Sequence, residues 1–454
     1  MLKQDSLLSY KMLKQDSLDR GELWYNTRMN LQKIQFVLAD QRDYCVHLLS
    51  LATCARTEEV LINLNSKLAQ VVTGVRRSGK STMCLNVLKK SGRPFAYVNF
   101  DDERFSGFIG SDFETLLTAA IKVYGSFDVF FLDEPQNVPE WPLFVNRLLR
   151  GGIHVVVTGS NSNLLGGELA THMTGRYNEI KLLPFSFKEY CDFKGVDASG
   201  LSVGARADRS AAFDVFLRDG AFPEVAEGEN PKRYIGTLVE SIRTKDIEKR
   251  YRIRYKSSLH RMIDHILNTV PAEMDFDALA KQFSFGSKQT AANYVEYMER
   301  SFLVNRVSKF SHKSKLRIFG EKMYPVDVSL MNARENAFQG DNLGWRLETV
   351  VGLELVRRAR MDSHDVYYYR DSRHECDFVV CENRKANAAY QVCYDISSEK
   401  TMRREIEGAV AAAKACGLDQ ATILTYSEMS ELRHSSGIRI NIMPAPEWLC
   451  QIGG

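Results

Sequence analysis

Apolar residues recur along the first half of the chain in two rhythms. Residues 27–69 carry them at helical spacing, as at Leu31, Ile34 and Val37. Short apolar runs of strand length then alternate with helical stretches, at 70–73, 95–100, 129–132, 155–158 and, more weakly, 177–182. Buried strands that alternate with helices favour a parallel sheet with crossover helices, an α/β fold.

In the second half of the chain, the spacing of apolar residues changes twice. Residues 185–250 have a mainly helical pattern, and residues 255–320 predict three helices followed by a short basic segment. Residues 345–454 predict a second α/β unit, with helices at 346–360 and 401–416 and strands at 366–369, 376–380, 389–393 and 421–425.

The composition is that of an ordinary globular protein of several domains. The chain has 454 residues, of which 44% are hydrophobic and 26% charged. Its net charge of +3 means that nucleic-acid binding requires local basic patches. The nine cysteines show no C-x-x-C spacing, which favours a reducing cytoplasm over a disulfide framework or a zinc site. Neither a signal peptide nor a membrane span is expected.

The N-terminus contains a short duplication. The heptapeptide MLKQDSL at 1–7 recurs at 12–18, which is too short for a structural repeat. We interpret residues 1–26 as a disordered or vector-derived segment.

A phosphate-binding loop follows the first predicted strand. Gly74-x4-Gly79-Lys80-Ser81 lies between a strand and a helix, where backbone N–H groups and a helix N-terminus can cradle a triphosphate. Lys80 is predicted to reach the β- and γ-phosphates, and Ser81 to bind Mg²⁺. The predicted ATP-binding residues are Gly74, Val75, Arg76, Arg77, Ser78, Gly79, Lys80, Ser81 and Thr82.

Two acids end a later apolar strand. Asp133 has the position of a second Mg²⁺ ligand, and Glu134 that of the residue that orients or deprotonates the attacking water. Two solvated acids at a strand end are the alternative, which the upstream phosphate loop disfavours.

Two further residues are candidates for the catalytic cycle. Ser160 or Asn161, after the strand ending at Thr158, is placed to sense the γ-phosphate, although turn chemistry also explains them. Arg176 is a candidate arginine finger, acting across a subunit interface or after a conformational closure, with a surface salt bridge as the alternative.

Several segments together resemble a known family. They are TGVRRSGKST, YVNFDDERF, FFLDEPQNVPEW, VVVTGSNSNLL, TGRYNEIKLLPFSFKEY, RLETVVGLEL, VYYYRDSRHECDFVV and TMRREIEGA. Over about residues 55–430 the chain resembles prokaryotic AAA-type ATPases with a C-terminal domain of unknown function, the AAA_14/DUF4143 architecture. The resemblance implies an AAA+/STAND-like parallel sheet in which the Thr158 strand separates the Asp133 strand from the P-loop strand.

The middle region has the pattern of a winged helix. Residues 276–283 and 287–298 predict its second and third helices, with Ser287 as an N-cap. Basic residues follow, and with a second basic run at 243–261 they make double-stranded DNA a candidate partner through 243–261 and 287–317. A protein-binding or lid module is the alternative for the winged helix, and a solvated helix face or a phosphate sensor is the alternative for the second basic run. The cations after the third helix are Arg306, Lys309, Lys313, Lys315 and Arg317.

The last domain of the family resembles the restriction-endonuclease fold, and its site is degenerate here. Active members use a helix Glu, a strand Asp and a following Glu-x-Lys to hold Mg²⁺. Glu348 and Asp377 match the first two positions, but the third reads Gln391-Val-Cys393. Glu375 or Lys400 would have to supply the missing groups, so we expect a catalytically silent module.

Taken together, the sequence predicts a Mg²⁺-dependent ATPase whose cycle drives a conformational switch on or beside DNA. A STAND-like signalling ATPase of low turnover and a Mg²⁺-dependent nuclease are the alternatives, and a homo-oligomer is a candidate assembly. The predicted boundaries are 27–190 for the ATPase domain, 191–254 for a helical lid, 255–325 for the winged helix and 326–454 for the nuclease-like domain.

Overall fold

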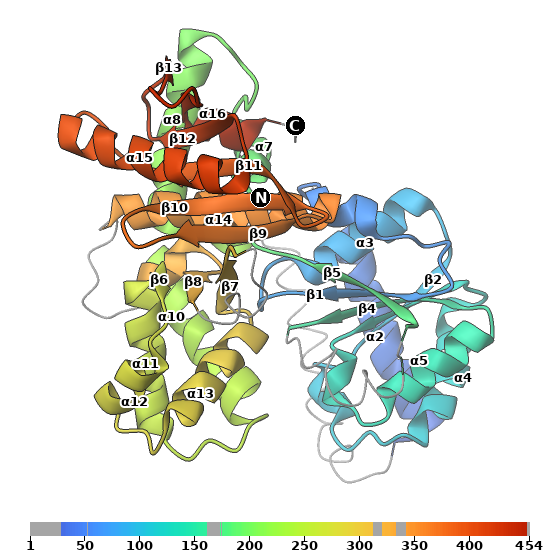
Figure 1. Cartoon of the computed structure of the whole chain (residues 1–454). Coiled ribbons are helices and arrows are strands. Elements are labelled where there is room, and N and C mark those ends of the chain that lie inside the picture. Colours follow the sequence, from blue (N-terminus) through green and yellow to red (C-terminus); the bar gives the residue numbers. More distant parts are fainter. Residues whose placement is uncertain are drawn as a thin grey trace.

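The computed structural model describes residues 29–51, 53–160, 173, 175–311, 320–332 and 342–451. The N-terminal duplication, Asn161, Lys313, Lys315 and Arg317 therefore lie outside the described residues. Figure 1 shows three regions: a first sheet with its helices, mostly in blue to blue-green, a helical region in green to yellow, and a second sheet whose strands are yellow to brown (β6 to β8) and orange to red (β9 to β14).

The first sheet has five parallel strands in the order β2-β3-β4-β1-β5. The prediction of a parallel α/β sheet is confirmed, and β4 lies between the Asp133 strand and the P-loop strand, as the resemblance implies. Its strands are β1 (Ala69–Thr73), β2 (Phe95–Asn99), β3 (Val129–Asp133), β4 (His154–Gly159) and β5 (Tyr177–Lys181).

Helices cover both faces of this sheet because alternate strand residues point to opposite sides. Val71 packs in one core with residues of α2, α4 and α5, whereas Val72 packs in the other with residues of α3. The helices are α2 (Leu31–Ser50), α3 (Lys80–Ser91), α4 (Asp112–Tyr124) and α5 (Trp141–Arg150). Among the described residues of 51–68, where helix was expected, only a short 3₁₀ helix forms, at Thr57–Leu61.

The helical region starts after β5. It contains α7 (Phe187–Lys194), α8 (Val203–Asp219), α9 (Pro223–Glu227), α10 (Pro231–Ser241), a π-helical turn (Ile242–Glu248), α11 (Lys256–Thr269), α12 (Phe276–Gln282) and α13 (Lys288–Arg300). The Ser287 side chain accepts a hydrogen bond from the backbone N–H of Thr290, so it caps α13.

A second, mixed sheet of nine strands has the order β13-β14-β12-β11-β10-β9-β7-β8-β6. Strands β6 to β8 come from the middle of the chain, and β7 pairs in parallel with β9, so the sheet crosses the boundary expected at 325/326. The strands are β6 (Ala272–Glu273), β7 (Val304–Lys309), β8 (Glu321–Pro325), β9 (Asp365–Arg370), β10 (Glu375–Glu382), β11 (Lys385–Val392), β12 (Gln420–Thr425), β13 (Ser430–Arg433) and β14 (Arg439–Pro444).

Three helices of the C-terminal half pack on or beside the second sheet. They are α14 (Leu343–Asp362), α15 (Glu399–Cys416) and α16 (Ala445–Cys450). Within the described part of the chain, none of the helices is both long and apolar enough to cross a lipid bilayer.

Candidate functional site

The P-loop connects β1 to α3 and depends on two glycines. A Cβ at Gly74, whose φ is +153°, would overlap the carbonyl oxygen of Leu182, so only glycine fits there. Gly79 has a left-handed φ of +88° and begins α3 as its N-cap. The backbone N–H groups at the start of α3 therefore face a turn that an anion can enter.

Lys80 lies inside this turn. Its ammonium donates to the carbonyl oxygens of Gly74 and Val75 at 3.1 and 3.0 Å, and its residue surface is only 5% exposed. Burial lowers the pKa of Lys80, and the carboxylates of Glu134 and Asp133 oppose that shift. The loop thus holds a buried cation at its centre.

Asp133 lies beside the start of α3. Its Oδ1 accepts from Ser81 Oγ at 3.0 Å and from Thr158 Oγ1, while its Oδ2 accepts from Tyr97 OH at 3.1 Å. Burial, followed by the charge of Glu134, raises the pKa of the Asp133 carboxyl. The sequence reasoning did not assign a role to Tyr97 or Thr158, although both lie near the carboxyl ends of strands beside β3, where parallel strands gather their polar side chains.

Glu134 follows with a left-handed φ of +52°. Its Oε2 accepts from the backbone N–H and the Oγ of Ser160, at 3.3 and 3.1 Å, and from Gln136. Because Ser160 follows β4, the strand between β3 and β1, it contacts Glu134 at the same edge of the sheet as the P-loop. The structure brings these two predicted residues together.

The two arginines of the P-loop contact the helical region. Arg76 donates to both carboxylate oxygens of Asp246, whose side chain is fully buried in the π-helical turn. Burial raises the pKa of Asp246, although Arg76 opposes that shift. Arg77 lies 3.6 Å from Glu224 and over the ring of Tyr234. These contacts connect the helical region directly to the P-loop.

Arg56 supports the P-loop from behind and was not identified from the sequence. Its guanidinium donates to the carbonyl oxygens of Ser78 at 2.8 Å and Leu183 at 2.6 Å, and pairs with Glu189 at 3.2 Å. Its side chain is 3% exposed. A lone arginine before a short 3₁₀ helix carries no local signal of such a role.

Arg176 lies at the opposite edge of the sheet. It precedes β5, its backbone carbonyl accepts from the N–H of Ala69 at the start of β1, and its side chain donates to Asn146 at 3.3 Å. The P-loop follows the other end of β1, so Arg176 is not brought to the phosphate site of its own chain. Its exposed position leaves the finger role as a prediction for a neighbouring copy.

The nuclease-like residues Glu348, Asp377 and Gln391 line an open cleft of about 1020 Å³. Lys322 of β8 reaches Glu348 at 2.7 Å, Glu375 at 3.0 Å and Asp377 at 3.6 Å. Burial disfavours the charge of Lys322, but these carboxylates outweigh it and raise its pKa. Gln391 accepts from the backbone N–H of Asp377 and donates to Glu405 at 2.6 Å.

The cluster therefore contains a lysine, and it comes from a strand that sequence reasoning did not consider. Glu375 reaches the cluster through Lys322, whereas Lys400 lines the cleft. In the described ranges, no group of three or more His, Cys, Asp or Glu side chains has a geometry suited to a metal ion.

The chain matches two family models. Residues 66–191 match the AAA_14 family, described as an AAA domain, and residues 211–341 match a domain of unknown function, DUF8612. The DUF4143 label implied by the resemblance stays a prediction.

Relatives extend the match over most of the chain. An uncharacterized protein of Methanocaldococcus jannaschii is 30% identical over 381 residues, covering 82% of this chain and 85% of the relative. An uncharacterized protein of Haemophilus influenzae is 28% identical over 343 residues, covering 72% of this chain and 82% of the relative. A Walker-type ATPase of Pyrococcus abyssi aligns at 14% identity and a TM-score of 0.38, over 63% of this chain and 99% of that one. Because residues 66–191 match the AAA_14 model and the Methanocaldococcus jannaschii relative is 30% identical over 82% of this chain, the chain belongs to the AAA-domain family AAA_14.

Proposed function

We propose that the chain binds ATP with Mg²⁺ and hydrolyses it. The observation that supports this most is the convergence of a buried P-loop lysine, a Ser81–Asp133 pair 3.0 Å apart and Glu134 at one edge of the sheet. Lys80 and the loop N–H groups would neutralise the phosphates. Glu134 would orient the attacking water and accept its proton.

The residues present suit a magnesium ion. Ser81 and Asp133 offer a hydroxyl and a carboxylate, the hard oxygen ligands that Mg²⁺ takes alongside phosphate oxygens. Bound there, the ion would screen the charge that develops on the phosphates.

Steady-state hydrolysis of ATP tests the site. We expect Lys80→Ala and Glu134→Gln each to lower kcat/KM by roughly 100-fold or more, because each removes a charge that acts on the transition state. Lys122→Ala and Glu103→Gln, at exposed positions of α4 and of the short 3₁₀ helix after β2, are matched controls and should hydrolyse ATP like the parent. Parental rates in both site variants would refute the assignment.

Low turnover is the second candidate. The P-loop contacts the helical region through the Arg76–Asp246 pair, which would couple a bound nucleotide to the rest of the chain, as a switch requires. A STAND-like switch of this kind would copurify with ADP and hydrolyse ATP at a negligible rate.

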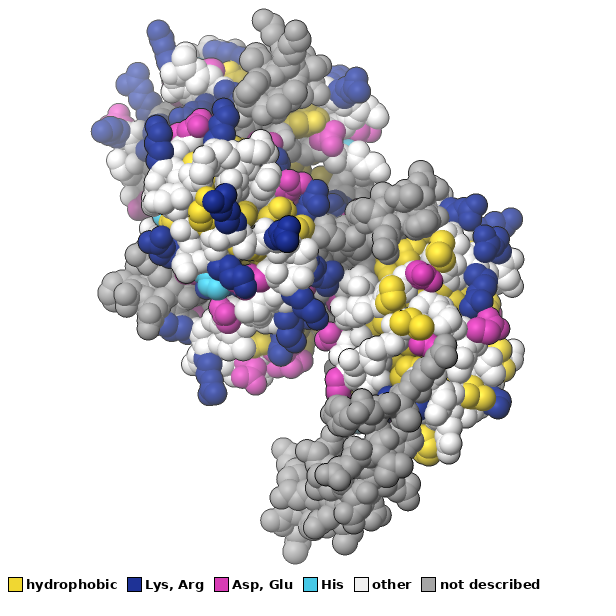
Figure 2. Space-filling model, turned by 90° about the horizontal axis from the view of Figure 1, so that it is seen from below, with side chains coloured by type: hydrophobic (Ala, Val, Ile, Leu, Met, Phe, Trp, Pro, Cys, Tyr) yellow, Lys and Arg dark blue, Asp and Glu magenta, His cyan; other side chains and the backbone are white. Residues whose placement is uncertain are grey.

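We also propose DNA contact through the middle region. The order α11-β6-α12-α13-β7-β8 supports a winged helix, and Lys288, Arg252 and Arg254 are exposed. Figure 2 shows Lys and Arg spread over the helical region, with Asp and Glu among them. Part of the basic run is neutralised, since Arg243 pairs with Asp264 and Lys256 with Glu248.

A salt-titrated gel shift with a short duplex tests this proposal. Each of Lys288→Ala, Arg252→Ala and Arg254→Ala should reduce the salt slope by about 1 if it contacts a phosphate. Arg243→Ala, which removes a paired arginine, should leave the slope unchanged. Absence of binding by the parent at low salt would refute DNA contact.

We propose that the nuclease-like cleft is catalytically silent. Gln391 is engaged by Glu405 and Asp377, and the Lys322 ammonium lies among the carboxylates that would otherwise attract a cation. Plasmid cleavage that disappears in Asp377→Ala would contradict this.

A further inference from the structure

The P-loop rests on the short segment 182–184 that leaves β5. The N–H of Leu182 donates to the carbonyl of Thr73 at 2.7 Å, and the Leu182 carbonyl fills the space beside Gly74. One step further, Arg56 bridges the carbonyls of Leu183 and Ser78. Both ends of the P-loop are therefore positioned by this segment.

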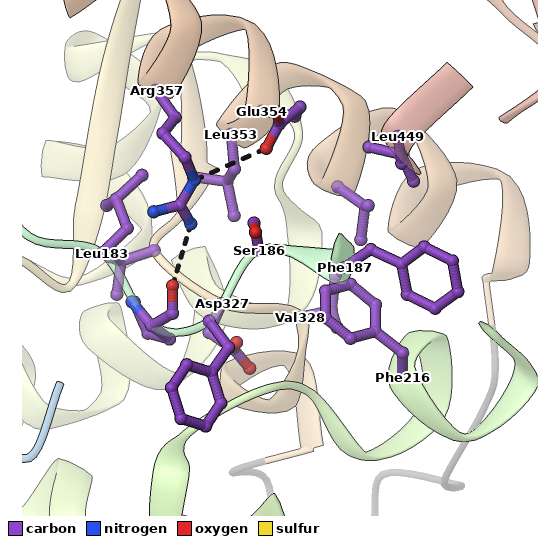
Figure 3. Close-up of a pocket in the computed structure, with 14 residues that line it drawn as sticks. Leu183, Ser186, Phe187, Phe216, Asp327, Val328, Leu353, Glu354, Arg357 and Leu449 are labelled. Atoms are coloured by element: carbon purple, nitrogen blue, oxygen red, sulfur yellow. Dashed lines mark hydrogen bonds and ion pairs between the residues drawn. The ribbon is translucent and has the colours of Figure 1, made fainter. Parts of the chain in front are cut away.

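Segment 182–184 is held in turn by α14 of the C-terminal half. Arg357 donates to the Pro184 carbonyl at 2.8 Å and to Glu58 Oε1 at 2.5 Å. The side chains of Arg357 and Glu58 are 6% and 4% exposed. Figure 3 shows that the Arg357 side chain of α14 points toward the segment that carries Leu183 and Ser186. Dashed lines mark the interactions of Arg357 with Glu354 on the same helix and with a backbone carbonyl of that segment.

The charges at this junction form one buried network. Arg56 pairs with Glu189, and Arg357 pairs with Glu58 and, at 3.4 Å, with Glu354. Burial alone would raise the pKa of Glu189, but the charges of Arg56 and Arg357 outweigh it and keep that carboxylate ionised. A buried ion pair keeps its geometry because an unpaired partner would be costly. The network therefore fixes the position of the Pro184 carbonyl. Because Pro184 belongs to segment 182–184, the network also fixes the segment on which the P-loop rests.

We propose that Arg357 is a positioning residue of the nucleotide site, through which the C-terminal half sets the shape of the P-loop. The inference rests on the proposed ATP binding at Lys80 and goes beyond it. Arg357 acts by holding the Pro184 carbonyl and the Glu58 carboxylate in place. Arg56 connects the same segment to the P-loop, because it also donates to the Ser78 carbonyl. Its loss loosens the support of the loop and weakens ATP binding, whereas Glu134 and the attacking water are left in place.

The neighbouring Arg358 provides a matched control. It lies on the same helix and makes a comparable set of contacts, to Glu354 at 2.8 Å and to the carbonyls of Trp448 and Gln451 at 3.0 and 3.1 Å. Those backbone contacts remain within the C-terminal half. A purely structural contribution of α14 would therefore appear in both arginine variants, but an effect on the P-loop only in Arg357.

The experiment measures binding of a fluorescent ATP analogue together with kcat and KM in the full chain. Arg357→Ala should raise both the dissociation constant and KM about tenfold, the size of effect expected from losing a charged hydrogen bond, and leave kcat within about threefold. Arg357→Lys should recover part of the affinity, because a lysine can still donate to one of the two acceptors. Arg358→Ala should melt at a lower temperature than the parent and bind the analogue normally.

A charge-balanced double variant tests the proposal even if Arg357→Ala does not fold. Arg357→Met combined with Glu58→Gln removes both charges, so no unpaired ion stays buried, yet Pro184 still loses its donor. It should reproduce the loss of affinity. Parental affinity in this double variant, or equal losses in the Arg357 and Arg358 variants, would overturn the proposal. Loss of binding in Lys80→Ala shows independently that the proposed nucleotide site stands, and a parent that binds no analogue would overturn both.

Discussion

At the scale of single residues, the nucleotide site is a set of side chains already engaged with one another. Lys80 bonds the loop, Ser81 bonds Asp133, and Glu134 bonds Ser160. Asp246 differs from the others because it is an anion of the helical region that pairs with Arg76 of the P-loop. We propose that a bound triphosphate competes with Asp246 for this arginine.

Asp246 predicts a pH dependence of nucleotide binding. Burial raises its pKa, so acidification protonates it and releases Arg76 to the phosphates. Binding of magnesium-free ADP should strengthen as the pH falls from 8 toward the raised pKa of Asp246. Asp246→Asn should bind about tenfold more tightly than the parent at pH 8, with the difference shrinking as the pH falls. Fluorescence titrations across this range measure both effects.

Asp264→Asn is the control for this experiment, since Asp264 is a carboxylate of α11 that pairs with Arg243 and not with the P-loop. It should retain the parental pH profile. Weaker binding by Asp246→Asn at pH 8 would show that Asp246 organises the loop and does not compete with phosphate.

Sequence reasoning found the residues whose signal is local. The spacing of Gly74, Gly79 and Lys80 and the acids after an apolar strand are readable because each motif lies within a few positions. Arg56 and Asp246 were missed because their partners are distant: Asp246 meets Arg76 from 170 positions away. Lys322 was missed for the same reason, since β8 enters the cleft from outside the expected domain.

At the scale of elements, two helices lie close against the second sheet because they carry glycine at the contact. A Cβ at Gly352 of α14 would approach the ring of Phe378 to 2.7 Å, and one at Gly408 of α15 would overlap the carbonyl of Glu375. The sequence predicted these helices from their period, but the period did not show which glycines permit the close approach.

Gly408→Ala should separate α15 from β10. The added methyl meets backbone that cannot rotate away, so we expect a loss of about 1–3 kcal/mol in unfolding free energy. Gly236→Ala in α10, where the methyl meets nothing within 4 Å, should instead stabilise the protein by about 0.5–1 kcal/mol. Urea unfolding of the two variants measures the contrast, and equal effects would contradict this packing.

At the scale of the whole molecule, α14 and the second sheet join regions that the sequence assigned to different domains. Arg346 of α14 donates to the carbonyls of Leu217 and Arg218 in α8, and β7 pairs with β9 through Ser308 and Lys309. The predicted domain boundaries rest on changes in the spacing of apolar residues along the chain. That spacing depends on local secondary structure, so it does not reveal which strands pair across a boundary.

Hydrogen exchange in urea tests this continuity. Because β7 and β9 share backbone hydrogen bonds, peptides covering 304–309 and 365–370 should lose protection at the same urea concentration. The peptide covering 69–73, in the other sheet, provides the reference for independent opening. Loss of protection in 304–309 at clearly lower urea than in 365–370 would contradict a single unfolding unit.

Helix α14 carries Glu348 at the cleft and Arg357 at the P-loop support, nine positions apart and so about 14 Å along one axis. Thermodynamic linkage gives this arrangement a strict consequence. A molecule that enters the cleft and changes ATP affinity through α14 by a given factor must have its own affinity changed by ATP by the same factor. The occupancy of either site can then be read by titrating the other.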